Sequence, residues 1–239
     1  MKRLRELINT ERSQYLAYSG VSIGVAILTG INYFSGNDHF ERFIGGANTL
    51  IACIGIIVLG FCLLSFLISK GWFAIYKKEN LKWLPFSAGL ALIPGAIIIL
   101  VDLKIIYPAN MNVPFPDSLL FYPAIGFFVE VLFHVVPLWA LMIILTSVFK
   151  NISRRRIIWI GILAVSLLEP IFQAASLHAS NRYPLWAVVY TGFHVLLINV
   201  FQLLIFRRYD FISMYSFRLV YYLIWHIVWG YARLTILFK

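Results

Sequence analysis

The sequence predicts an all-α fold, a polytopic membrane bundle of about seven transmembrane helices with a cytoplasmic N-terminus. Hydrophobic residues make up 61% of the 239 residues and charged residues only 13%, whereas a soluble domain is about half apolar and a quarter charged. Several apolar runs reach the length of about 20 residues that a helix needs to cross a bilayer. The segments between these runs are alternately rich and poor in Lys and Arg, as expected when every second loop faces the cytoplasm.

The predicted spans form a single membrane domain over residues 1–239. They cover residues 15–35, 43–69, 86–106, 118–149, 157–180, 184–206 and 211–237. The fourth run is longer than one span needs, and Pro123 and Pro137 are expected to kink or break it. In the fifth, Pro170 leaves the carbonyl of Ser166 without its helical donor and is expected to bend the helix.

Two connecting segments have compositions that predict their structure. Residues 70–85 mix Lys with Trp, Phe and Tyr, a composition typical of a helix that lies at the lipid headgroups. Residues 107–117 contain three prolines and are expected to form a loop.

The basic residues predict the orientation of the chain. The alternate segments 36–42, 107–117 and 181–183 contain at most one basic residue each, Arg42 or Arg182. The basic segments are the N-terminus (Lys2, Arg3, Arg5, Arg12), residues 70–85 (Lys70, Lys77, Lys78, Lys82), residues 150–156 (Lys150, Arg154, Arg155, Arg156) and the 207–210 turn (Arg207, Arg208). This pattern places the N-terminus in the cytoplasm and the C-terminus outside, with the plasma membrane of a prokaryote as the expected location.

The charges and cysteines exclude several classes of protein. The net charge of +10 is distributed between the spans, so membrane lipids rather than nucleic acid are the expected partner. Cys53 and Cys62 lie nine residues apart on one predicted helix and cannot form a disulfide with each other. The chain has no Walker A motif and no Lys in its last span, which argues against ATP hydrolysis and against a retinal Schiff base.

Polar and ionisable residues occur inside four of the predicted spans, where an unpaired charge costs several kcal/mol. Such residues are functional candidates by default. They are Glu130 and His134 in the fourth span, Glu169 and Gln173 in the fifth, His194, Asn199 and Gln202 in the sixth, and Arg218, Tyr222 and His226 in the seventh.

Several of these candidates lie at a similar depth, roughly 12–18 Å from the outer boundary. We therefore expect Glu130, Glu169, Gln173 and His226 to face one shared cavity and to contact one another directly or through one water. We expect His226 rather than Arg218 to be the partner of Glu130, because Arg218 starts about two turns closer to the cytoplasm. The alternative is that each polar residue bonds a neighbouring backbone carbonyl and has only a packing role.

Zinc is the metal that these residue types would suit, with His134, His194 and His226 as ligands beside Glu130 or Glu169. The spacing is dispersed and contains no H-E-x-x-H helix, so metal binding stays open at the level of sequence.

Three stretches resemble the motifs of the CPBP intramembrane proteases, the CAAX-protease and bacteriocin-processing family. GFFVEVLFHVVPL at 126–138 resembles a degraded form of the family's E-E-x-x-x-R motif. SLLEPIFQ at 166–173 lies where the family has F-x-x-x-H, and residues 206–230 resemble its last motif helix, which holds a His and, one turn later, an Asn. The resemblance covers roughly residues 118–230.

The match is incomplete at individual positions. Glu130 falls on the second Glu of the first motif, whereas the first Glu, usually taken as the catalytic one, is Val129, and His134 stands in place of the Arg. Glu169 replaces the Phe of the second motif and Gln173 its His. His226 matches the His of the last motif, and Gly230 replaces its Asn. In the family, the carboxylate and histidines activate a water that attacks a peptide bond, and the Asn helps to hold the oxyanion.

The resemblance therefore implies either a rewired peptidase that uses Glu130, His134, Glu169, Gln173 and His226 on a membrane-tethered peptide, or an inactive relative. Two other classes stay open. The chain could be a small proton- or ion-coupled transporter, because its intramembrane charges could relay protons. It could also be a non-catalytic subunit that binds a partner through the aromatic-rich seventh span.

Overall fold

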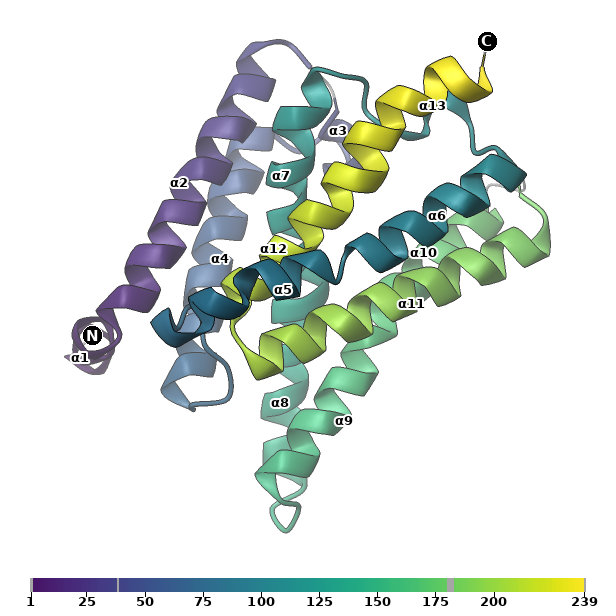
Figure 1. Cartoon of the computed structure of the whole chain (residues 1–239). Coiled ribbons are helices and arrows are strands. Elements are labelled where there is room, and N and C mark those ends of the chain that lie inside the picture. Colours follow the sequence, from purple (N-terminus) through teal and green to yellow (C-terminus); the bar gives the residue numbers. More distant parts are fainter. Residues whose placement is uncertain (1, 38, 180–182, 239) are drawn as a thin grey trace.

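The structure is a computed structural model that describes residues 2–37, 39–179 and 183–238 (Figure 1). These residues form helices and connecting loops, with no strand among them. Seven helices or helix series are long and apolar enough to cross a membrane: Arg12–Phe34, Thr49–Ser69, Lys78–Ile105, Asp117–Val148, Arg154–Ala179, Leu185–Arg208 and Phe211–Leu237. The structure confirms the predicted all-α polytopic bundle, and the chain is an integral membrane protein.

Four of the seven spans consist of more than one helix. The short helices α1 (Lys2–Thr10) and α3 (Glu41–Ile44) precede the first and second spans. The spans themselves are built from α2 (Arg12–Phe34), α4 (Thr49–Ser69), α5 (Leu84–Gly89) with α6 (Leu92–Ile105), α7 (Asp117–Val129) with α8 (Val136–Val148), α9 (Arg154–Ser166) with α10 (Leu168–Ala179), α11 (Leu185–Arg208), and α12 (Phe211–Tyr222) with α13 (Gly230–Leu237).

The second span begins at Thr49, so its predicted start at residue 43 was wrong. Gly45 and Gly46 have positive φ angles of 62° and 79°, a conformation that glycine adopts without strain but that ends a helix. Asn48 then caps α4, because its side chain accepts hydrogen bonds from the backbone N–H groups of Leu50 and Ile51.

The segment predicted as a headgroup helix is helical only in its second part, the 3-10 helix Lys78–Trp83. The residues before it form a turn and an irregular segment packed into the bundle, and Trp72, Phe73 and Ile75 are buried. Two carbonyls of this stretch accept hydrogen bonds from the start of α12, Ala74 O from Phe211 N at 3.0 Å and Ile75 O from Ile212 N at 3.1 Å. Tertiary packing against α12 therefore replaces the helix that composition alone predicts.

The predicted effects of Pro137 and Pro170 are confirmed, whereas α7 continues through Pro123 without a break. Between α7 and α8 lies a π-helical turn, Glu130–Val135, that ends two residues before Pro137, which has no N–H to bond the carbonyl of Phe133. The fifth span breaks at Leu167, and Asn199 Nδ2 of α11 lies 3.5 Å from the Ser166 carbonyl that Pro170 leaves without its helical donor. A second π-helical turn, Leu223–Trp229, connects α12 with α13.

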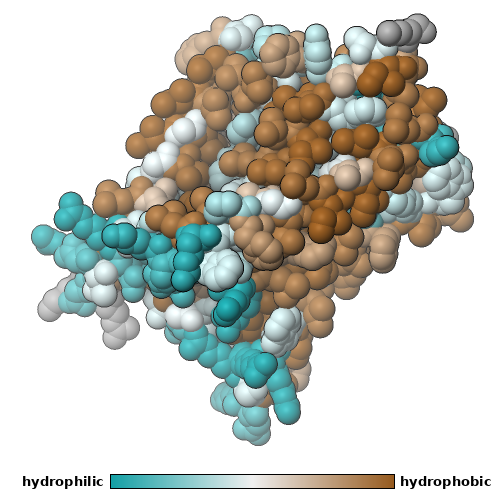
Figure 2. All heavy atoms as spheres, in the orientation of Figure 1, coloured by the Kyte–Doolittle hydropathy of each residue, from teal (hydrophilic) through white to brown (hydrophobic). Residues whose placement is uncertain are grey.

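The outer surface is apolar over most of its height. Figure 2 shows hydrophobic side chains across the face of the bundle and hydrophilic ones gathered at the end that holds α1 and the α8–α9 loop. Large apolar side chains such as Ile51, Leu185 and Phe193 are 65–72% exposed, an arrangement that suits contact with lipid tails. Several segments predicted to be cytoplasmic thus lie at one end of the molecule. The side of the membrane that this end faces stays a prediction, and Arg182 lies outside the described residues.

A buried ion pair closes the opposite end of the bundle. Arg233 of α13 donates to Asp102 of α6 through Nε at 2.6 Å and through Nη2 at 2.8 Å. Two further N–H groups bond the carbonyls of Tyr107 and Pro108 at 2.5 and 2.9 Å, and Trp229 Nε1 also donates to Asp102 at 2.7 Å. We call this group, formed by Asp102, Tyr107, Pro108, Trp229 and Arg233, the Asp102 clasp.

Candidate functional site

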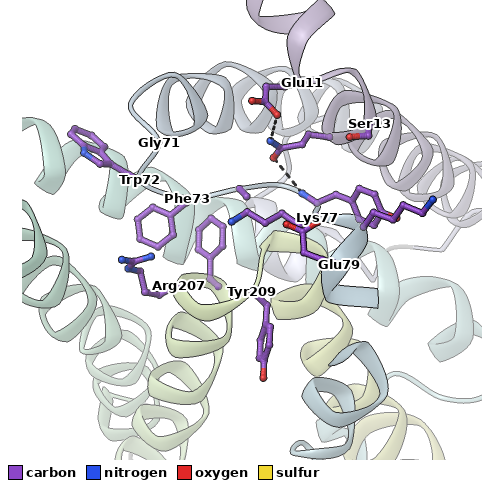
Figure 3. Close-up of a pocket in the computed structure, with 14 residues that line it drawn as sticks. Glu11, Ser13, Gly71, Trp72, Phe73, Lys77, Glu79, Arg207 and Tyr209 are labelled. Atoms are coloured by element: carbon purple, nitrogen blue, oxygen red, sulfur yellow. Dashed lines mark hydrogen bonds between the residues drawn. The ribbon is translucent and has the colours of Figure 1, made fainter. Parts of the chain in front are cut away.

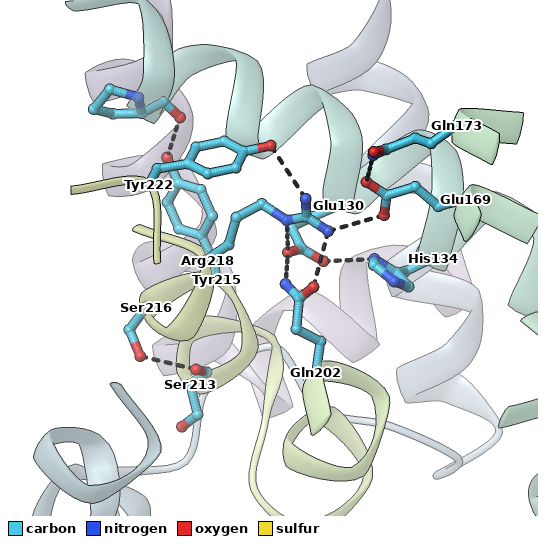
Figure 4. Close-up of polar contacts among 11 residues, drawn as sticks. Glu130, His134, Glu169, Gln173, Gln202, Ser213, Tyr215, Ser216, Arg218 and Tyr222 are labelled. Atoms are coloured by element: carbon cyan, nitrogen blue, oxygen red, sulfur yellow. Dashed lines mark hydrogen bonds and ion pairs between the residues drawn. The ribbon is translucent and has the colours of Figure 1, made fainter. Parts of the chain in front are cut away.

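Arg218 on α12 is the centre of a buried polar cluster that joins four of the spans (Figure 4). Its Nε lies 2.5 Å from Glu130 Oε1, at the start of the π-helical turn in the fourth span. Its Nη2 lies 3.2 Å from Glu169 Oε2 on α10 and 2.9 Å from Gln202 Oε1 on α11. Its Nη1 donates to the hydroxyl of Tyr222 at 3.1 Å. We call this group, with His134 and Gln173 added, the Arg218 cluster.

Glu130 is the most enclosed carboxylate of the cluster and is fully buried. Besides Arg218, its Oε1 accepts a hydrogen bond from Gln202 Nε2, and its Oε2 lies 2.8 Å from His134 Nδ1. The π-helical turn brings Glu130 and His134 together four residues apart. With three donors on its two oxygens, Glu130 is held as an acceptor and is not directed at open space.

Glu169 is held more loosely. It receives one N–H from Arg218 and one from Gln173 Nε2 at 2.9 Å. It is 4% exposed and lines a pocket of about 300 Å³ between the spans. Glu169, unlike Glu130, is therefore accessible to a molecule in this pocket.

This intramembrane pocket has polar groups set in mainly apolar and aromatic walls. Gln173, Arg218 and His226 line it together with Glu169. Most of its other lining residues are apolar or aromatic: Phe43, Ile98, Tyr107, Met111, Tyr122, Ile125, Val129, Phe133, Phe172, Val195, Ile198, Tyr221, Tyr222 and Trp225, with His194 and Thr191 on α11. An apolar cavity with a few convergent polar groups is the usual form of a small-molecule site.

His226 lines the pocket from the second π-helical turn. Its Nδ1 lies 2.7 Å from Asn112 Oδ1, in the loop predicted for residues 107–117. The ring stacks on Tyr122, with centroids 4.4 Å apart and an interplanar angle of 19°. Asn112 fits here because residue 230 is a glycine, since a Cβ at Gly230 would lie only 3.0 Å from Asn112 Nδ2.

His194 lies apart from the charged residues. Its Nε2 is 3.2 Å from the hydroxyl of Tyr221, and its Nδ1 is 3.4 Å from that of Tyr190. Both partners are neutral. His194 therefore adds hydrogen-bonding groups to the pocket but is not part of the ion-pair network.

The structure brings together most of the residues predicted to share a cavity, but with different partners. Glu169, Gln173 and His226 line one pocket, whereas Glu130 lies behind Arg218 and does not line it. The predicted Glu130–His226 pair is absent, because Arg218 bonds Glu130 and Asn112 bonds His226. The expectation that Arg218 starts too near the cytoplasm was wrong, because the long side chain reaches both carboxylates.

Two residues of this region, Asn112 and Gln202, are not among those predicted from the sequence to share the cavity. Asn112 could not be found from the pattern, because it lies in a proline-rich loop that only the fold brings to His226. Gln202 stood among the intramembrane polar residues, and its depth on the sixth span was the signal that could have linked it to Glu130.

The suggested zinc ligands do not converge. Across residues 2–37, 39–179 and 183–238, no three His, Cys, Asp or Glu side chains come together in a way that could hold a metal ion. His134 bonds Glu130, His194 bonds tyrosines and His226 bonds Asn112, so each histidine has a different neighbour.

The aromatic residues of the seventh span face mostly inward. Tyr215, Phe217, Tyr221, Tyr222 and Trp225 are all buried in the bundle. Tyr231, by contrast, is 61% exposed. Helix packing accounts for most of these aromatics, which leaves little aromatic surface on this span for a partner protein.

A larger cavity of about 420 Å³ lies at the basic end, beneath α1 and α2 (Figure 3). Its charged residues have both signs, with Lys77 and Arg207 beside Glu11 and Glu79. Gln14 crosses it by accepting from Ile75 N at 2.7 Å and donating to Glu11 at 2.7 Å. The cavity lies between the first span and residues 72–77, and its lining residues form no buried cluster of ionisable side chains.

Comparison with known proteins gave no match: no family model, curated protein or solved structure is significantly similar to the chain.

Proposed function

We propose that the protein is a non-proteolytic relative of the CPBP proteases that binds a small ligand in its intramembrane pocket. The family is proposed from the resemblance of the motifs, and the absence of peptide cleavage is proposed from the residues that line the pocket. Val129, which stands in place of the first Glu of the family's motif, lines the pocket, as does Gln173, which stands in place of a His. Neither side chain can take a proton from water.

The remaining acidic groups do not replace the missing base. Glu130 is turned away from the pocket and has three hydrogen-bond donors. Glu169 lines the pocket, but it already accepts hydrogen bonds from Arg218 and Gln173, so both of its oxygens are engaged in the Arg218 cluster. On this proposal the cavity and its convergent polar groups serve binding, because Val129 and Gln173 stand in place of a carboxylate and a histidine that activate a water in the family.

A cleavage assay tests this proposal. The full chain would be purified, reconstituted in liposomes and incubated with membrane-tethered peptides, prenylated and unprenylated, with and without added zinc. We expect no cleavage above the level of a His226→Gln variant. The opposite result would be cleavage that is lost in His226→Gln or Glu169→Gln but kept in the exposed-site control Glu79→Gln. That result would establish the rewired peptidase.

A coupled carrier is the second candidate, favoured by the excess of carboxylates over guanidinium groups in the Arg218 cluster. Two carboxylates share one guanidinium deep in the bundle, and intramembrane groups of this kind take part in proton relays. Flux in proteoliposomes with an imposed pH gradient would test it. Proton-dependent uptake that Glu169→Gln removes would support transport, and absence of flux for ions and amines would oppose it.

A further inference from the structure

We propose that the intramembrane pocket binds an organic ammonium ion, with the ammonium group held by Glu169. This inference rests on the proposed binding function and specifies the chemical class of the ligand. Three independent features of the pocket support it: its charge balance, its aromatic walls and the state of His226.

The charge balance of the Arg218 cluster is negative by one unit. Glu130 and Glu169 each contact Arg218, which carries a single positive charge. His134 bonds Glu130 through Nδ1, and its Nε2 is buried without a hydrogen-bond partner. Glu169 has no contact with this ring and shares the guanidinium of Arg218 with Glu130.

No other group facing the pocket supplies the missing positive charge. His194 contacts only the neutral hydroxyls of Tyr190 and Tyr221, so an imidazolium there would be a buried charge without a counter-ion. The nearby Asp102–Arg233 pair contributes nothing, because its two charges cancel each other.

The excess charge resides at Glu169, on the pocket wall. Glu130 has the closer contact with Arg218, at 2.5 Å against 3.2 Å, and accepts two further hydrogen bonds. The second donor to Glu169 is the neutral amide of Gln173. A carboxylate that shares its Arg with a better-placed competitor attracts a further cation, and Glu169 is the one that a ligand can reach.

The walls of the pocket also favour a cation with an apolar body. Tyr122, Tyr221, Tyr222, Trp225 and Phe172 all line it. The negative faces of aromatic rings attract ammonium groups in sites from which water is excluded. At about 300 Å³, the cavity suits a compact amine rather than a long peptide.

His226 favours an ammonium that carries N–H groups over a quaternary one. Its Nδ1 lies 2.7 Å from Asn112 Oδ1, so Nδ1 carries the proton and donates to Asn112. The other ring nitrogen, Nε2, is then an acceptor, and His226 lines the same cavity as Glu169. An alkylammonium has N–H donors for both acceptors.

A series of three matched ligands tests the inference on the full chain in lipid nanodiscs, with empty nanodiscs as the blank. Calorimetry at pH 7 would compare n-hexylamine, 1-hexanol and hexanoate, which share one chain length and differ in charge. We expect hexylamine to bind about tenfold or more tightly than hexanol, the effect of one charge-assisted hydrogen bond. Hexanoate is expected to show no binding.

Two variants locate the effect. Glu169→Gln is expected to remove the preference for the amine, whereas Glu79→Gln, the same change at an exposed site, is expected to retain it. Equal binding of hexylamine and hexanol by the unmodified chain would overturn the inference without any variant, as would a preference for the amine that survives Glu169→Gln. A preference for hexanoate would overturn it as well.

The peptide-cleavage assay on the same preparation separates this inference from the proposed function. Cleavage together with amine preference would refute the non-proteolytic proposal and leave the ligand class standing. Absence of both cleavage and amine preference would refute the ligand class alone.

Discussion

Two buried arginines in this protein stand in opposite situations. Arg233 in the Asp102 clasp meets one carboxylate, and two further N–H groups reach the backbone carbonyls of Tyr107 and Pro108. Arg218 in the Arg218 cluster meets two carboxylates, and one of them, Glu169, borders a cavity. Both arginines are almost fully buried, so the difference lies in the balance of charge.

The comparison shows how a structural ion pair can be told from a candidate binding site. A balanced pair with most of its donors and acceptors in use holds segments together, here α6, the following loop and α13. An unbalanced group beside a cavity retains the capacity to attract a further charge. The following predictions test whether the two sites differ in this way.

Arg218→Met is expected to have the largest effect. It leaves both Glu130 and Glu169 buried without a cation, and breaking a buried pair by removing one partner costs about 3–5 kcal/mol. We expect a loss of about 5 kcal/mol in the free energy of unfolding, measured by denaturant titration in mixed micelles. The triple variant with Glu130→Gln and Glu169→Gln should recover much of the loss, and a single variant as stable as the unmodified chain would contradict the central role of Arg218.

Arg233→Met is expected to cost somewhat less, about 3 kcal/mol, because Asp102 keeps hydrogen bonds from Trp229 Nε1 and from the backbone N–H of Tyr107. The same unfolding titration measures it. Because neither Asp102 nor Arg233 lines the pocket, we expect the ligand preference of the folded variant to be unchanged. A changed preference for hexylamine over hexanol would show that the clasp is not purely structural.

Glu169→Gln sharpens the comparison most directly, because it removes a carboxylate from the unbalanced site. The change brings the Arg218 cluster to neutrality and keeps a side chain that can bond both Arg218 and Gln173, so we expect stability to change by no more than about 1 kcal/mol. Asp102→Asn in the clasp is the matched change, and it should cost about 3 kcal/mol because it leaves Arg233 without a counter-ion. Equal losses in the two unfolding titrations would remove the distinction between the sites.

The fold was predictable from the sequence because a bilayer imposes a length on each apolar run. The errors occurred where local or tertiary interactions overrode composition, as at Gly45 and Gly46, which end α3, and at residues 72–77, which pair with the start of α12. The break at Leu167 was predictable because it follows from the missing N–H of Pro170.

The candidate site was predictable only in part. Depth along each span grouped Glu130, Glu169, Gln173 and His226 correctly near one region, but depth carries no information on rotation about the helix axis. The π-helical turns at Glu130–Val135 and Leu223–Trp229 also change the direction in which later side chains point. Pro137 predicted a kink in the fourth span but not its π-helical form, and no sequence pattern predicted the second turn. Partner choice therefore required the structure.

Gly230→Ala is expected to have the smallest effect on stability and a specific effect on His226. The new Cβ would lie 3.0 Å from Asn112 Nδ2 and 3.2 Å from its Cβ, so the loop has to shift, at a cost of about 1 kcal/mol. The shift would lengthen the contact between Asn112 Oδ1 and His226 Nδ1, now 2.7 Å, and remove the acceptor that fixes the ring proton.

Nitrogen NMR of the histidine side chains, with His226 assigned through His226→Gln, would report the tautomer directly. Gly24→Ala on α2 is the control, because a Cβ there meets no atom within 4 Å. An unchanged His226 tautomer in Gly230→Ala would show that Asn112 does not fix the ring, and the acceptor role given to Nε2 would then lose its support.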